Sequence, residues 1–336
     1  MQSQENGSVQ PARTVSDLPP VLETRGLGKR FGRRWAVREL SLRVHAGEVF
    51  GFLGPNGAGK STTIRMLLSL VRPSSGEVLL FGKPLRAHRR ETLARVGGLV
   101  ERADFYLYLT ARKNLEIVAA LRGGVPRAGI DEVLDIVGLL GRADDKVKTF
   151  SHGMKQRLGI AQALLGFPEF IVLDEPTSGL DPQGIKEVRE LIERLRTERG
   201  MTVFLSSHLL HEIEQTATAM AIINGGSVVV QGTVRELLAG PEVRLHLEAH
   251  PGERAEALLR QEPRVSDLHR DANHLQCTLP VELVPVLTRA LVEAGIAVHS
   301  LVPRRSLEEF FLSITDGASE IARRDRHRRS SAGGPP

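Results

Sequence analysis

The hydrophobic pattern of the chain alternates short apolar runs with longer stretches of helical spacing. Strands are predicted where the apolar runs lie, near Val21 and at 49–53, 77–81, 96–100, 170–173 and 203–205. Helical spacing occupies 64–70, about 110–166 and the segment that follows Pro182, with Asp181 as its expected N-cap. Buried strands that alternate with helices predict a mainly parallel sheet covered on both faces, an α/β fold.

The pattern changes at Gly240-Pro241, which we interpret as a linker. The segments beyond it predict strand 243–248, helix 253–261, strands 264–269 and 273–278, helix 281–294, strand 297–302 and a short helix at 306–314. This βαββαβ order is typical of a small ferredoxin-like α+β domain. We therefore expect a disordered segment at 1–20, a main domain at 21–240, an accessory domain at 241–316 and a basic disordered tail at 317–336.

Composition sets the class of protein. The 336 residues are 41% hydrophobic and 25% charged, which is ordinary for a globular protein of about two domains. No apolar stretch approaches the roughly 18 residues that cross a bilayer, and the polar first twenty residues do not predict a secretory signal. Cys277 is the sole cysteine, so we expect a small buried side chain in a reducing compartment.

The net charge of +5 is concentrated in part at the carboxyl terminus. Five arginines crowd together there, at Arg323, Arg324, Arg326, Arg328 and Arg329. Such a tail can contact nucleic acid or an anionic membrane, or it can be a solvated end without a partner.

The sequence GPNGAGKS matches a phosphate-binding loop, with Gly54, Gly59, Lys60 and Ser61 at the four fixed positions. A strand is expected before it and a helix after it, as the motif requires. Glycines let successive backbone N–H groups curl around an anion, and the helix adds its positive end. Lys60 is expected to reach the β- and γ-phosphates of ATP, and the Ser61 hydroxyl to bind Mg²⁺. The expected nucleotide contacts are Gly54, Pro55, Asn56, Gly57, Ala58, Gly59, Lys60, Ser61 and Thr62.

Two acids end an apolar strand, in the run FIVLDE at 170–175. A buried parallel strand ends at the edge of the sheet where nucleotides bind. Asp174 is suited to hold Mg²⁺, and Glu175 to accept a proton from the attacking water. An acidic pair alone is more often a solvated turn, but behind a phosphate loop the hydrolytic role is favoured.

Five further segments stand in the order found in ATP-binding cassette proteins, which residues 21–240 resemble. They are Phe31 in LGKRFG, Glu101 after VGGLV, SHGMKQRLGIAQAL from Ser151, SGLD ending at Asp181, and SSH ending at His208. The resemblance implies a P-loop NTPase domain with a helical subdomain at about 100–166. It also implies a head-to-tail dimer, a homodimer on our expectation, in which each ATP lies between the phosphate loop of one subunit and the signature of the other.

The resemblance assigns roles to these residues. Ser151 and Gly153 would bind the γ-phosphate held by the other subunit, and a plain N-cap is the alternative for Ser151. Asp181 would lie at the dimer seam. His208 would contact the γ-phosphate, whereas a lone histidine is otherwise a surface residue. Phe31 would stack on adenine, with core packing as the alternative.

Besides Phe31, which replaces the family's more usual tyrosine but keeps the ring, the chain departs from the family pattern at two positions. Glu101 stands where most members have glutamine; it can still bind Mg²⁺ or orient water, but it adds negative charge near the phosphates. His152 replaces a glycine, which makes that position less permissive. Both departures resemble ATPases of the lantibiotic-immunity and bacitracin-export type. The terminal segment SLEEFFLSITD, at 306–316, resembles the extension of daunorubicin-resistance drug exporters.

We therefore expect the ATP-hydrolysing subunit of an exporter on the cytoplasmic side of the membrane, driving a separate transmembrane permease. Its substrates would be drugs, antibiotic peptides or lipid-like molecules. The aromatic segment 104–109 would be the docking site for the permease or, alternatively, local core packing. The competing hypothesis is a soluble ATPase that acts on nucleic acid or ribosomes. The single cassette and the absence of a heptad run count against it.

Overall fold

The computed structural model describes residues 20–101, 103–238 and 242–304. The chain divides into two compact units, one ending at Gln231 and one beginning at Gly232. The predicted linker at 240–241 and the predicted helix at 306–314 lie outside the described residues, as do both predicted disordered ends apart from Pro20, which begins a strand. The predicted domain limits stay a prediction.

The first unit is built on a six-stranded sheet that carries the phosphate loop. Its order is β10 (Ser227–Thr233), β9 (Ala219–Asn224), β3 (Val49–Leu53), β8 (Thr202–Ser207), β7 (Phe170–Leu173) and β6 (Val96–Leu99). The neighbours from β9 to β6 pair in parallel. All residues of β3, β7 and β8 are buried, which explains their uninterrupted apolar runs.

A second sheet in this unit is antiparallel. It consists of β2 (Arg34–His45), β1 (Pro20–Phe31), β4 (Ser75–Leu80) and β5 (Lys83–Pro84), in that order. The expectation of a mainly parallel sheet was therefore wrong for the strands near Val21 and at 77–81. Strand β2 was missed because a left-handed residue, Glu39 with φ +50°, interrupts its alternation of apolar and polar positions.

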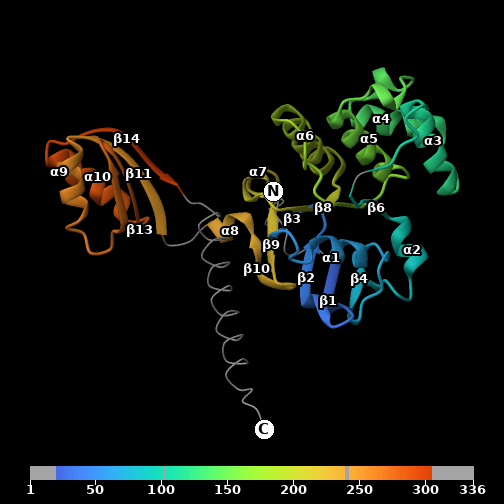
Figure 1. Cartoon of the computed structure of the whole chain (residues 1–336), viewed down its shortest axis with the longest axis horizontal. Helices are drawn as coiled ribbons and strands as arrows, with labels where there is room; N and C mark the ends of the chain where they lie inside the picture. The colour runs from blue at the N-terminus through green and yellow to red at the C-terminus, as the bar shows by residue number, and fades with distance from the viewer. Residues whose placement is uncertain (1–19, 102, 239–241, 305–336) are drawn as a thin grey trace, which may run out of the picture. The chain divides into compact units, whose positions relative to one another are not determined.

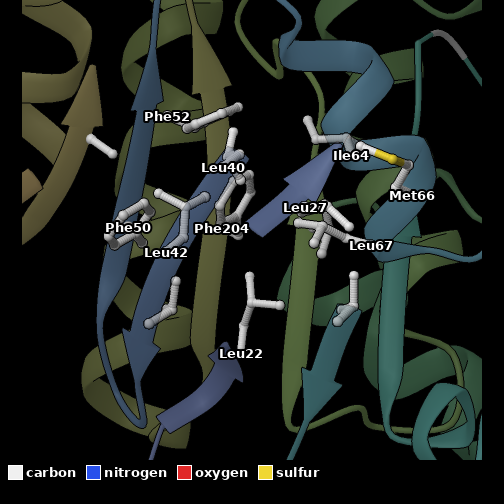
Figure 2. Packing of buried hydrophobic residues seen from close by; sticks show 14 of the residues in the cluster. Leu22, Leu27, Leu40, Leu42, Phe50, Phe52, Ile64, Met66, Leu67 and Phe204 are labelled. Atoms are coloured by element: carbon white, nitrogen blue, oxygen red, sulfur yellow. The ribbon is translucent and has the colours of Figure 1, made fainter. Parts of the chain in front are cut away.

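One hydrophobic core joins the two sheets through the helix that follows the phosphate loop. Helix α1 (Lys60–Leu67) contributes Ile64, Met66 and Leu67 to the same cluster as Leu40 and Leu42 of β2 (Figure 2). The rings of Phe50 and Phe204, from β3 and β8, stack with centroids 5.6 Å apart. The loop that enters α1 is therefore held by packing on both of its flanks.

Helices cover the six-stranded sheet on the side away from α1 (Figure 1). Helices α5 (His152–Leu164), α6 (Pro182–Arg199) and α7 (Leu210–Thr216) pack on the strands, and α3 (Ala111–Leu121) and α4 (Arg127–Ile136) pack on α5. The 3₁₀ turns η2 (Leu140–Arg142) and η3 (Val147–Thr149) lie between α4 and α5 in the sequence. Helices α3, α4 and α5 fall within the segment predicted to be helical. A short helix, α2 (Arg89–Ala94), precedes β6.

The second unit has the predicted ferredoxin-like order. It begins with α8 (Val234–Leu238) and continues with β11 (Glu242–His250), α9 (Gly252–Leu259), β12 (Ser266–Asp271), β13 (His274–Pro280), α10 (Leu283–Glu293) and β14 (Ala297–Arg304). The sheet order is β12–β13–β11–β14, and every neighbouring pair is antiparallel. Alternate residues of β11 are buried in a core of their own, so this unit has an independent interior.

Candidate nucleotide site

The phosphate loop has the backbone that an anion nest requires. Gly59 has φ +111° and directly precedes α1, and Gly57 has φ +80°. A Cβ atom on Gly54 would lie 2.4 Å from the carbonyl oxygen of Ile223, and one on Gly59 would lie 2.6 Å from that of Ala36. Glycine is required at 59 for conformation and at both 54 and 59 for space.

The predicted loop residues lie together at the amino end of α1. Pro55, Asn56 and Gly57 are exposed, Ala58 is buried, and Ser61 and Thr62 are half-buried. Lys60 is buried, and its Nζ donates to the carbonyl oxygen of Gly54 at 2.7 Å. The lysine therefore curls back over its own loop, in position to reach an anion held there.

The two acids diverge at the end of β7. Asp174 is only 5% exposed, and its Oδ1 accepts a hydrogen bond of 2.6 Å from the Ser206 hydroxyl. The backbone N–H of Glu175 donates to the same hydroxyl oxygen at 2.9 Å. Glu175 itself is left-handed, with φ +47°. A turn of this kind changes the direction of the chain, so the Glu175 side chain leaves the strand differently from that of Asp174.

Glu175 lies between two cationic or polar partners. One carboxylate oxygen, Oε1, is 3.3 Å from Lys60 Nζ, and the other, Oε2, is 3.1 Å from Nδ1 of His208. His208 follows β8, next to β7 in the sheet. The structure thus brings together the three residues that the sequence predicts as catalytic.

A pocket of about 320 Å³ gathers the three predicted metal ligands, Ser61, Asp174 and Glu101, together with Glu175. It is lined by Ser61, Glu101, Gln156, Asp174, Glu175 and Ser178. A hydroxyl and carboxylates are the oxygen ligands that Mg²⁺ prefers. No cluster of three or more His, Cys, Asp or Glu among the described residues could hold a metal alone. This donor set therefore fits an ion that also binds the phosphates of its substrate.

Sequence reasoning missed two lining residues and one ion pair of this pocket. Gln156 is buried on α5, five residues after the N-cap Ser151, and Ser178 lies three residues after Glu175. Glu101 is left-handed, with φ +61°, and its carboxylate pairs with the guanidinium of Arg65 on α1. No local pattern in the sequence could have indicated Arg65, because its partner Glu101 lies 36 residues further along the chain.

Ser151, Gly153 and Asp181 do not line this pocket. Ser151 is exposed and caps α5, with its hydroxyl accepting from the N–H of Met154 at 3.2 Å. Asp181 caps α6 by accepting from the N–H of Gly184 at 2.9 Å, as predicted. His152 is the first residue of α5, and its φ is not in the left-handed range, so this backbone does not need the family's glycine.

Two aromatic groups are exposed near the site elements. Phe31, at the end of β1, is 53% exposed and has Lys29 Nζ 5.0 Å from its ring centroid. Tyr106 and Tyr108 are 52% and 67% exposed, and their rings meet edge to face with centroids 6.1 Å apart. Such exposure does not fit core packing for these three rings. A role in binding adenine or a partner stays a prediction.

Known proteins match this chain over most of its length. The family model described as "ABC transporter" matches residues 37–178. The bacitracin transport ATP-binding protein BcrA of Bacillus licheniformis is 41% identical over 305 residues, covering 90% of this chain and 99% of that protein. The lantibiotic transport ATP-binding protein SrtF of Streptococcus pyogenes is 40% identical over 212 residues, covering 63% of this chain and 90% of that protein.

A solved structure gives the same result for the fold. The structure of cbiO1 from Clostridium perfringens, part of the ABC transporter complex cbiONQ, has a TM-score of 0.60 and 26% identity. The match covers 73% of this chain and 96% of the cbiO1 chain. The P-loop NTPase fold predicted from the sequence is therefore confirmed.

The comparisons also decide between the two functional hypotheses. They confirm an ATPase subunit of an ABC exporter and do not favour the ATPase that acts on nucleic acid or ribosomes. None of the helices in the described part of the chain is long and apolar enough to cross a membrane. A subunit of this kind binds ATP and works with a membrane permease. The chain belongs to the ATP-binding proteins of ABC transporters.

Proposed function

We propose that two copies of this chain bind two Mg·ATP head to tail and use hydrolysis to drive an exporter of antibiotic peptides. The observation that carries the proposal is a divided site. Ser61 of the phosphate loop, Asp174 and Glu175 line one pocket, and His208 contacts Glu175, whereas Ser151 and Gly153 lie at the amino end of α5 and do not line it. A second copy would complete the site by bringing that helix end to the γ-phosphate.

The phosphates would be held by the loop from Gly54 to Thr62. Its N–H groups and the amino end of α1 attract negative charge, and Lys60 adds a full positive charge. Ser61 and Asp174 would hold Mg²⁺, with Glu101 beside them. When bound, the ion neutralises charge on the transferred phosphoryl group. Ser206 fixes Asp174 through a 2.6 Å hydrogen bond, so one oxygen of this buried carboxylate is already oriented.

Hydrolysis would begin with a water molecule next to Glu175. The Glu175 carboxylate would accept the proton as the water attacks the γ-phosphorus, and ADP would leave as the bond from its β-phosphate oxygen to that phosphorus breaks. His208 lies 3.1 Å from that carboxylate and would hold the water and the γ-phosphate in line. Lys60, which contacts Glu175 in this structure, would turn to the γ-phosphate and leave Glu175 free to act as the base.

The second copy would contribute the signature. The Ser151 hydroxyl and the Gly153 N–H lie at the amino end of the 13-residue helix α5, where the helix dipole favours an anion. Asp181 begins α6 and would lie at the seam between the copies. Phe31 would stack on adenine, consistent with its exposed ring.

The permease would dock on the exposed tyrosine pair at 106 and 108. Interfaces favour aromatic anchors of this kind, and the pair is held by Asn114, whose Oδ1 accepts from the N–H of Tyr106 at 2.8 Å. The transported class follows from the names of the relatives, which transport bacitracin and a lantibiotic. The chain would then work at the cytoplasmic face of the cell membrane.

Mixing two inactive variants tests the divided site. Lys60→Ala removes the phosphate ligand, and Gly153→Asp places a carboxylate where the γ-phosphate would lie. A Cβ on Gly153 meets nothing closer than 3.9 Å, so this variant should fold. Each variant alone should be nearly inactive. Their equimolar mixture should regain up to about a quarter of the parental ATPase rate, because half of the random dimers contain one complete site.

The mixture also has a result that refutes the proposal. If Gly153→Asp alone hydrolyses ATP at the parental rate, Gly153 does not face a phosphate. If mixed dimers form, as shown by pull-down of one tagged variant with the other, and no activity returns, the site is not shared between copies.

A further inference from the structure

A buried carboxylate lies behind the candidate catalytic residues and has no role in the site described above. Glu212 on α7 is 8% exposed. One of its oxygens, Oε2, accepts two hydrogen bonds, from the Thr177 hydroxyl at 2.7 Å and from the Ser207 hydroxyl at 2.8 Å. A buried acceptor of two hydroxyl groups holds both of their chains in place, because leaving either hydroxyl unpaired would cost free energy.

The two hydroxyls belong to the two loops that carry the proposed base and the histidine. Thr177 lies two residues after Glu175, in the segment between β7 and α6. Ser207 ends β8 and directly precedes His208. Glu212 therefore joins the loop of the base to the loop of the histidine through a single oxygen atom.

Ser207 also fixes the backbone on the far side of His208. Its hydroxyl oxygen accepts from the N–H of Leu209 at 2.9 Å while the hydroxyl donates to Glu212. The preceding residue, Ser206, makes the matching link to Asp174 and Glu175. Ser206 and Ser207 therefore both link the loop that carries His208 to the loop that carries Glu175, Ser206 directly and Ser207 through Glu212.

Packing leaves space beside this polar link. A cavity of about 290 Å³ lies beside the carboxylate, lined among others by Thr177, Ile185, Leu205 and Glu212. Loss of the hydrogen bonds would leave Thr177 room to shift into that space. The link joins the two loops between which His208 Nδ1 lies 3.1 Å from Glu175 Oε2.

We propose that Glu212 is a positioning residue that sets His208 against Glu175 by accepting hydrogen bonds from Thr177 and Ser207. It touches no substrate itself. The inference rests on the proposed function, which makes Glu175 the base and gives His208 the γ-phosphate. A small displacement of a general base lowers the rate steeply. Loss of the Glu212 carboxylate should therefore lower kcat and leave the affinity for ATP nearly unchanged.

The test compares Glu212→Ala with Glu212→Gln and Thr177→Val in the full-length chain. The glutamine variant keeps an oxygen that can accept from both hydroxyls, whereas alanine removes it; the valine variant removes one donor at nearly constant shape. His211→Ala, an exposed neighbour on the same helix, is the matched control. We measure kcat, the KM for ATP, the affinity for a non-hydrolysable ATP analogue, and the unfolding temperature, so that assays run only on folded protein.

Glu212→Ala should lower kcat by about ten- to a hundredfold, with KM and analogue affinity within about twofold of the parent. Thr177→Val should lower kcat less, and Glu212→Gln should retain at least about a third of it. His211→Ala should match the parent. Parental kcat in Glu212→Ala overturns the proposal. So does a Glu212→Gln variant as impaired as a folded Glu212→Ala variant, or a loss of analogue affinity parallel to the loss of kcat.

Two further variants separate this inference from the proposed function. If Glu175→Gln and His208→Ala both turn over like the parent, the catalytic assignment fails, whatever Glu212 does. If those variants are inactive and Glu212→Ala is fully active, only the positioning role fails. If Glu212→Ala does not fold, the proposal is tested by the kcat of Thr177→Val, which should be lowered, against that of Glu212→Gln, which should be largely retained.

Discussion

Lys60 Nζ lies 3.3 Å from Glu175 Oε1, so the phosphate-loop lysine and the proposed base form an ion pair across the site. The lysine is buried and the carboxylate half-buried, which leaves little water to screen their attraction. In the proposed function an arriving γ-phosphate would compete with Glu175 for the same cation. Binding of ATP would therefore be coupled to release of the base.

Phe31 is expected to contribute to the affinity for ATP by stacking on adenine. Phe31→Ala should raise the KM for ATP about tenfold, because stacking of a base on an aromatic ring contributes roughly 1–3 kcal/mol. The kcat should change little, since the ring contacts no phosphate. Phe31→Tyr keeps the ring and should behave like the parent. An unchanged KM in the alanine variant would assign the exposed ring another role.

The charge of Glu101 should weaken ATP binding unless Arg65 balances it. Glu101→Gln removes a negative charge beside the phosphates, so the Kd for ATP should fall by about two- to fivefold at low salt, a difference that shrinks as salt screens it. Arg65→Gln leaves the carboxylate unbalanced, and the Kd should rise. Isothermal titration at two salt concentrations measures both shifts. Weaker binding by Glu101→Gln would instead make this carboxylate a net ligand of the bound complex.

The elements that position the site could largely be predicted, because their residues satisfy local rules. Strand β3 is wholly apolar, the loop needs its glycines, and Asp181 and Ser151 are N-caps of the helices that follow them. The antiparallel sheet could not be predicted, because its pairing of β1 with β4 joins segments far apart in sequence. No local pattern records such a partner.

The polar network behind the site escaped sequence analysis for a similar reason. Glu212 looks like any charged residue on a short helix, and its burial depends on Thr177 of a distant loop. Arg65 likewise gains meaning only from Glu101, which lies 36 residues along the chain. Contacts between side chains from different loops become visible only when the fold has placed them.

The tyrosine pair should matter for docking and not for chemistry. Tyr106→Ala combined with Tyr108→Ala should keep the basal ATPase rate within about twofold and reduce binding to membranes that contain the permease, because aromatic anchors dominate interfaces. Sedimentation of the tagged chain with native membranes measures the loss. A double variant that binds membranes like the parent would place the docking site elsewhere.

Cys277 should be unreactive in the folded protein. Burial raises the pKa of its thiol to about 11, so iodoacetamide should not label it at pH 8 until the chain unfolds. The raised pKa also sets how the thiol's contribution to stability changes with pH. The thiol's contribution to stability is full below the unfolded pKa, about 8.5, and is lost as pH rises toward 11. Rapid labelling at pH 8 under native conditions would contradict this burial.

The central claim is that Glu175 is the base in an ATP site shared by two copies. Its most direct measurement is the turnover of Glu175→Gln, together with its ATP binding and its size in solution with Mg²⁺ and ATP. The variant should bind ATP, lose at least about a hundredfold in kcat, and form a stable ATP-bound dimer, because the amide keeps the shape but accepts no proton. A variant that turns over like the parent, or that remains monomeric with ATP bound, would contradict the claim.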